Sequence, residues 1–134
     1  MRIASWNLNH RVGYTLFQPD AANAAIALDV DAIFFNEYFP KTNGVEFEQK
    51  LADAGYSQQL ISPASPEVAN RTFLASRVPV EPDVLPLPSF DHQLPANLLV
   101  VRFPGANLRV IAVRVPWYQK PHTENFLHAW DWIE

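Results

Sequence analysis

Two stretches decide the fold: residues 2–9, RIASWNLN, and residues 29–38, DVDAIFFNEY. Residues 2–6 of the first stretch are typical of a β-strand, and Asn7 and Asn9 follow. Asparagine is depleted in strands, and residues two apart along a strand point to the same face. The two asparagines therefore mark either the turn that ends the strand or a pair of carboxamides that belongs to a site.

A helix and a second strand are expected next. Residues 19–28 start with proline and are rich in alanine, which predicts a helix. Residues 32–35, AIFF, form a continuous apolar run, as in a strand that is buried on both faces. Strand, helix and strand in this order predict a parallel, right-handed crossover.

This crossover gives the asparagines a partner. Parallel strands bring their carboxyl ends to one edge of the sheet, so Asn7 and Glu37, which end the two strands, are expected there together. A carboxylate and a carboxamide are oxygen ligands that Mg²⁺ accepts. Turn formation is the alternative role for both residues, and their spacing alone leaves it open.

Shorter elements complete the map. Apolar residues at positions 47, 51 and 54 predict a helix over residues 45–54 that Gly55 ends. The further strands are expected at residues 56–61, 72–76, 84–87, 98–103 and 108–115, the last two forming a hairpin that turns at residues 104–107. A final helix is expected at residues 123–133, where the apolar positions share one face.

Composition excludes several classes of protein. The 134 residues fit one domain or a large part of one, and 49% of them are hydrophobic, as in a globular chain. With a net charge of −4 and no basic run, binding to nucleic acid mainly by counterion release is not indicated. The absence of cysteine excludes disulfides, thiolate metal sites and a cysteine nucleophile. No apolar run approaches the length of a membrane span, so a cytoplasmic location is expected.

Four segments, in order along the chain, resemble motifs of the endonuclease/exonuclease/phosphatase superfamily. They are residues 2–9 (RIASWNLN), 29–37 (DVDAIFFNE), 70–80 (NRTFLASRVPV) and 108–116 (LRVIAVRVP). The resemblance implies an α/β fold, a β-sandwich flanked by helices in four αββα layers. It also implies that residues 1–134 form the N-terminal part of such a domain, so that the sandwich is incomplete.

The resemblance further implies roles for individual residues. Glu37 resembles the family's metal-binding glutamate, and Asn7 the asparagine that contacts both the metal site and the scissile phosphate, with Mg²⁺ or Mn²⁺ as the cofactor. Asn9 stands where some members have an aspartate near the metal. Arg114 stands where the family usually has a histidine or tyrosine beside the phosphate; arginine stabilises phosphate charge but does not act as an acid or base near neutrality. Tyr118 can stack on a substrate base or sugar, or pack a loop against the core.

Two motifs of the superfamily are not found in the sequence. These are Gly-Asp-x-Asn, expected shortly after the last helix, and a C-terminal Asp-His pair; Asp91-His92 comes too early in the chain. A metal-dependent phosphoesterase that is inactive or incomplete without a C-terminal half is therefore the first expectation. The alternatives are a non-catalytic metal- or phosphate-binding remnant and a self-associating module. The expected partners are a phosphorylated small molecule or nucleic acid, and a second copy or the C-terminal half.

Overall fold

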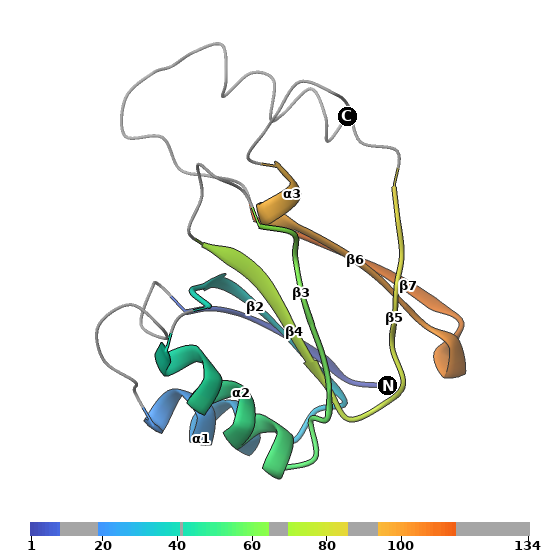
Figure 1. Ribbon diagram of the computed structural model, residues 1–134. Coiled ribbons are helices and arrows are strands. Elements are labelled where there is room, and N and C mark those ends of the chain that lie inside the picture. Colours follow the sequence, from blue (N-terminus) through green and yellow to red (C-terminus); the bar gives the residue numbers. More distant parts are fainter. Residues whose placement is uncertain (9–18, 41, 65–69, 86–93, 115–134) are drawn as a thin grey trace.

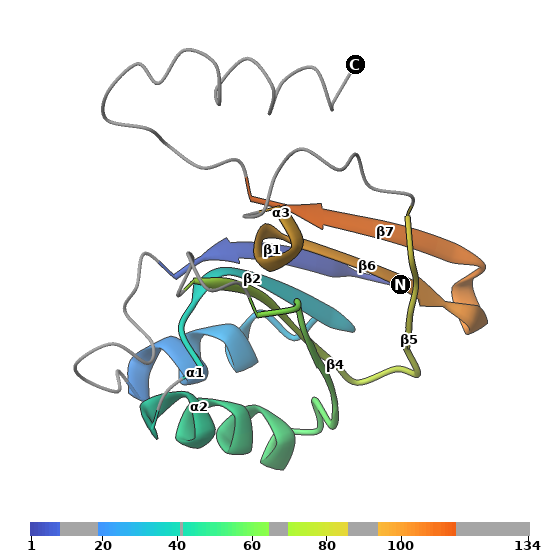
Figure 2. The same cartoon turned by 45° about the horizontal axis from the view of Figure 1, so that its top comes forward.

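The structure is a computed structural model that describes residues 1–8, 19–40, 42–64, 70–85 and 94–114. Two sheets lie face to face, and two helices pack on the outer side of the first sheet (Figures 1 and 2). In chain order the elements are β1 (Ile3–Asn7), α1 (Pro19–Ala27), β2 (Ala32–Tyr38), α2 (Thr42–Asp53), β3 (Gln58–Ile61), β4 (Arg71–Ser76), β5 (Glu81–Pro82), α3 (Leu94–Asn97), β6 (Leu98–Phe103), η1 (Pro104–Ala106) and β7 (Leu108–Val113). The order of strands is β1-β2-β4-β3 in the first sheet and β5-β6-β7 in the second.

The expected crossover at the start of the chain is confirmed. β1 and β2 are parallel neighbours in a register that runs from Ile3 opposite Ala32 to Asn7 opposite Asn36. α1 lies between them in sequence and covers the sheet with Ala22 and Ala25, both fully buried. Small side chains allow this helix to approach the sheet closely, which is why an alanine-rich segment serves here.

β2 is the centre of the fold because its two faces contribute to two different cores. Ile33 and Phe35 pack with the helices, whereas Ala32 and Phe34 pack with the second sheet. This alternation follows from the two-residue period of a strand. The apolar run of β2 is buried on both faces, as its sequence predicts.

The second sheet covers the inner face of the first over β2, β3 and β4, whereas Ile3 on β1 stays 38% exposed. Because the sequence predicts an incomplete sandwich, a second copy or the C-terminal half was expected as a partner. In the described part of the chain, Leu99, Val101 and Phe103 of β6 pack against the first sheet instead. The alternation of apolar residues in β6 points these three side chains into the core between the sheets. Dimerisation stays a prediction.

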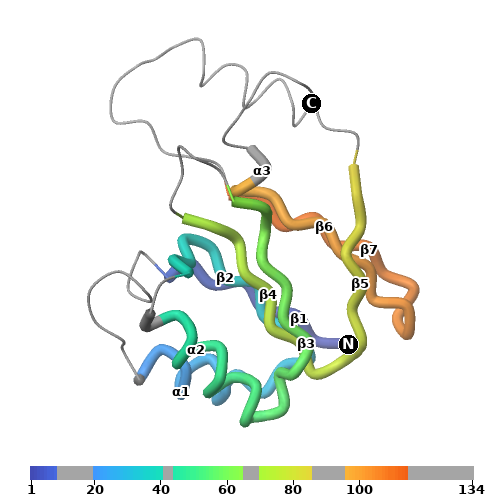
Figure 3. The backbone as a smooth tube through the Cα atoms, in the orientation of Figure 1, coloured from blue at the N-terminus to red at the C-terminus, as the bar shows by residue number. Residues whose placement is uncertain are grey.

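The strand expected at residues 84–87 is absent at residues 84 and 85, and residues 86 and 87 lie outside the described part of the chain. The strand here is β5, two residues long at Glu81–Pro82, paired with Arg102 and Val101 of β6 (Figure 3). Pairing ends where the side chain of Asp83 accepts a hydrogen bond from the backbone of Val84, at 2.8 Å. Side chains of this kind compete with strand pairing, and Val84 is left 81% exposed.

α2 ends at Asp53, one residue before the expected end, and it starts three residues earlier than expected. Gly55 has a φ of +94° and donates to Ala52, while the amide of Tyr56 donates to the carbonyl of Leu51 at 3.0 Å. These are the two hydrogen bonds of a Schellman motif, which favours glycine at the left-handed position. None of the helices in the described part of the chain has the length and apolar character to cross a membrane.

Gly44 provides a test of the packing between α2 and β2. Gly44→Ala is expected to lower the free energy of unfolding by about 1–3 kcal/mol, because the added methyl group overlaps the hydroxyl of Tyr38 and lies 3.2 Å from the carbonyl oxygen of Phe39. That cost exceeds the gain of about 1 kcal/mol from the higher helix propensity of alanine. Urea denaturation measures the difference.

Gly105→Ala is the matched control for this prediction. Nothing lies within 4 Å of the methyl group that it would add. Its effect is expected to stay within about 0.5 kcal/mol of zero, as for an open surface position. Equal effects of the two substitutions would contradict the close contact of α2 with Tyr38.

Candidate active site at the carboxyl ends of β1 and β2

The first site residue, Asn7, lies where the sequence predicted it, at the carboxyl end of β1. It pairs with Asn36 of β2, and the amide of Leu8 donates to the carbonyl of Asn36 at 2.9 Å. Trp6 and Phe35 point toward the helices, so their neighbours Asn7 and Asn36 lie on the other face, toward the second sheet. The two carboxamides therefore share a face beside Glu37.

A β-bulge sets the direction of Glu37. The pairing of β2 with β4 shifts between Phe35 and Tyr38, and both of these aromatic residues pack in the helix-side core. Two residues, Asn36 and Glu37, thus stand where a regular strand has one. Glu37 takes a φ of +59°, a left-handed conformation that costs a non-glycine residue roughly 1–2 kcal/mol. Strain of this kind clusters at functional sites.

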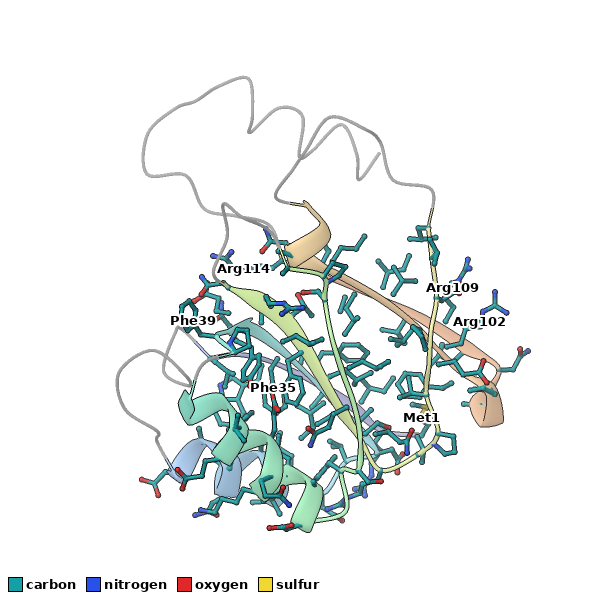
Figure 4. All side chains as sticks on the ribbon, viewed as in Figure 1. Met1, Phe35, Phe39, Arg102, Arg109 and Arg114 are labelled. Carbon is teal, nitrogen blue, oxygen red and sulfur yellow. The ribbon has the colours of Figure 1, made fainter. Side chains whose placement is uncertain are left out.

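Glu37 meets Arg114, the residue that follows β7 in the second sheet. Nε of Arg114 donates to Oε1 of Glu37 at 3.2 Å, and the two side chains are only 18% and 14% exposed. The bulge thus turns the carboxylate toward the second sheet, because Arg114 belongs to that layer. Asn7 pairs with the residue before Glu37, and Glu37 contacts Arg114, so the three predicted site residues lie at one edge of the sandwich. Figure 4 shows Arg114 at this edge.

Buried polar residues surround this edge, and sequence reasoning missed them. Thr72 of β4 donates its hydroxyl hydrogen to Oδ1 of Asn36 at 3.4 Å. Ser62 donates to the carbonyl of Ala96 at 2.5 Å, and its Oγ accepts from the amide of Thr72 at 3.0 Å. Asn97, only 1% exposed, accepts a hydrogen bond from Arg114. Buried polar groups with partners of this kind fix one arrangement of the chain.

Tyr38, the residue that follows the bulge, links the end of β2 to α2. Its hydroxyl donates to a carboxylate oxygen of Glu48. Burial, reinforced by this hydrogen bond to an anion, raises the pKa of Tyr38 far above its ordinary value. Tyr38 is therefore protonated near neutral pH, where its hydroxyl serves as a hydrogen-bond donor to Glu48.

The oxygen ligands that this edge offers are few, but they are enough for a small divalent cation. Glu37 offers one carboxylate and Asn36 a carboxamide oxygen on β2, and Asn7 offers a second carboxamide oxygen on the neighbouring strand β1. Mg²⁺ is commonly held by one or two carboxylates, with water or substrate phosphate completing its shell. Among the described residues there is no group of three or more histidine, aspartate or glutamate side chains that could hold a metal. The predicted site residues Asn9 and Tyr118 lie outside the described residues.

Two other charged clusters lie away from this edge. Near the start of β1, hydrogen bonds from Arg77 and Arg2 hold the pKa of Asp29 below its usual range. On the second sheet, hydrogen bonds from Arg109 and Arg102 do the same for Asp83. These carboxylates are neutralised by arginines, as expected of surface ion-pair networks.

A hollow of about 500 Å³ lies beside the second of these clusters. It is lined by Glu81, Arg102, Phe103, Pro104, Asn107, Leu108 and Arg109. Figure 4 places Arg102 and Arg109 at the end of the second sheet opposite Arg114. The hollow and the predicted site residues are therefore separate features.

The two face-to-face sheets, with two helices on the outer side of the first, are similar in fold to a solved protein structure. The crystal structure of an endonuclease/exonuclease/phosphatase from Beutenbergia cavernae DSM 12333 has this fold, with a TM-score of 0.67 to this chain and 18% sequence identity. The match covers 96% of this chain and 40% of that protein, so the chain spans less than half the length of this structural relative. No protein-family model and no curated protein matches the sequence.

Proposed function

We propose that the edge formed by Asn7, Glu37 and Arg114 is part of the active site of a divalent-cation-dependent phosphoesterase. The observation that carries the proposal is the convergence of these residues from β1, the bulge of β2 and the segment after β7. It occurs at the carboxyl ends of two parallel strands, where α/β proteins usually bind ligands. The shared fold with an endonuclease/exonuclease/phosphatase supports the same class of reaction.

Each residue has a separate task in this proposal. Glu37 and the carboxamide oxygen of Asn7 would hold Mg²⁺ or Mn²⁺, which when bound neutralises phosphoryl oxygens and stabilises a leaving group. Arg114 binds the phosphate anion and keeps its positive charge at any working pH. Asn9 and Tyr118 are proposed to contact the substrate. A phosphorylated small molecule suits the acidic chain better than a nucleic acid duplex.

A second candidate is a site that binds a metal or phosphate without turnover. It is favoured by the ion pair between Glu37 and Arg114, because this ion pair occupies the carboxylate that a cation would need. Without a group that deprotonates the attacking water, a factor of about 10²–10⁴ in rate is lost. The two candidates share the same ligands and differ in chemistry.

Calorimetric titration with inorganic phosphate tests the proposed site. Phosphate is expected to bind the chain in the presence of Mg²⁺ and about tenfold more weakly without it, because the cation carries most of the charge that phosphate meets. Glu37→Gln is expected to remove the effect of Mg²⁺. Glu81→Gln, an exposed carboxylate on β5, serves as the matched control and should leave it unchanged. A Mg²⁺ effect that survives in Glu37→Gln would place the site elsewhere.

A further inference from the structure

Arg114 is held at two points by one buried residue that has no role in the proposed chemistry. The backbone amide of Arg114 donates to the carbonyl of Asn97 at 2.9 Å. Nη1 of Arg114 donates to Oδ1 of Asn97 at 3.2 Å. The same guanidinium donates through Nε to Oε1 of Glu37. Asn97 and Glu37 thus hold the guanidinium from two sides, which leaves it little freedom of orientation.

The burial of Asn97 favours the arrangement in which Arg114 is hydrogen-bonded to it. The Asn97 side chain is 1% exposed, and it is among the largest fully buried side chains in the described part of the chain. A buried carboxamide that loses a partner bears the full cost of its desolvation, so Asn97 favours the state in which Arg114 stays bound to it. Asn97 also ends α3 immediately before β6, where two ordered elements fix its backbone.

The position of Arg114 has a consequence for cation binding. Glu37 is the carboxylate that the proposed site offers to a metal, and its Oε1 already accepts from a guanidinium. A Mg²⁺ ion requires carboxylate oxygens at about 2.0–2.1 Å in a nearly ideal octahedron. A guanidinium hydrogen-bonded to the same oxygen hinders that approach and repels the ion, so the two cations compete for one carboxylate.

We propose that Asn97 is a positioning residue that locks Arg114 onto Glu37, so that a divalent cation binds Glu37 only by displacing Arg114. The inference rests on the proposed function, because it takes Glu37 to be the cation ligand. It predicts that the wild-type chain binds divalent cations weakly. It also predicts that loosening Arg114 strengthens that binding.

Titration calorimetry with Mn²⁺ alone, on the full 134-residue chain, tests the proposal. Arg114→Gln is expected to bind Mn²⁺ at least about tenfold more tightly than the wild type, because a competing positive charge is removed. Asn97→Ala is expected to shift affinity in the same direction by a smaller factor. Damage to the fold would weaken binding, so a gain in affinity is a result that a merely structural role of Asn97 does not produce.

Controls separate the possible failures. Arg102→Gln removes one positive charge from an exposed position at the far end of β6 and should leave the affinity nearly unchanged. Affinity that is equal or weaker in Arg114→Gln, but lost in Glu37→Gln, overturns the competition and leaves the proposed site intact. Tighter binding in Arg114→Gln without a gain in Asn97→Ala overturns the positioning role. Equal binding in all variants, Glu37→Gln included, overturns the proposed function itself.

Discussion

Replacing Phe35 by alanine is expected to lower the free energy of unfolding by about 3–5 kcal/mol. Phe35 is fully buried at the centre of β2, and its ring lies 5.2 Å from that of Phe47 and 5.8 Å from that of Phe73. Truncation removes transfer free energy and leaves a cavity between the sheet and α2. Domains of this size are stable by only about 5–15 kcal/mol, so a large part of the total is lost.

Urea denaturation followed by circular dichroism measures this effect, with Val84→Ala as the control. Val84 is 81% exposed, so its truncation should change the free energy of unfolding by less than about 0.5 kcal/mol. A Phe35→Ala chain as stable as the control would show that the core is not centred on β2.

Much of the fold could be predicted from the sequence, because the elements of its central unit are close together along the chain. The strand at residues 2–6, the alanine-rich helix and the apolar run of β2 lie within 40 residues and predict the parallel crossover correctly. The hairpin of β6 and β7 is equally local, and its turn lies at the expected residues, with Asn107 in a left-handed conformation. Strand β5 could not be predicted in the same way, since its two residues are strand only by pairing with β6.

The sequence names the residues of the candidate site but does not give their geometry. The pairing of Asn7 with Asn36 follows from the register of two parallel strands. The bulge at Glu37 left one signal in the sequence: apolar residues at positions 33, 35 and 38, where strict alternation would place the last at 37. A slip of this kind indicates an inserted residue, although by itself it does not say where the inserted side chain points.

Asn97 was missed because it matters only through a long-range contact. It stands in a single helical turn, and no local pattern marks it. The hairpin register nevertheless contains the information, since Leu98 pairs with Val113 and the next residue on each strand is Asn97 and Arg114. Extending a predicted hairpin by one pair would have placed the carboxamide opposite the predicted site arginine.

The second large effect is expected for Glu37→Gln in cation binding. Glu37 is the single carboxylate of the proposed donor set, and even residues that only orient metal ligands typically change affinity 10- to 100-fold. Loss of its charge is therefore expected to weaken Mn²⁺ binding by about 100-fold or more. Glu81→Gln again provides the matched control, because it removes the same charge from an exposed position on β5.

Paramagnetic broadening by Mn²⁺ in the amide spectrum of the isotope-labelled chain tests the central claim most directly, since it locates the ion on the fold. The account predicts that the signals of Asn7, Leu8, Asn36 and Glu37 broaden first, and that Glu37→Gln removes this broadening while Glu81→Gln leaves it unchanged. Broadening centred on Asp29 or on Asp83, with the signals at the carboxyl ends of β1 and β2 unaffected, would contradict it.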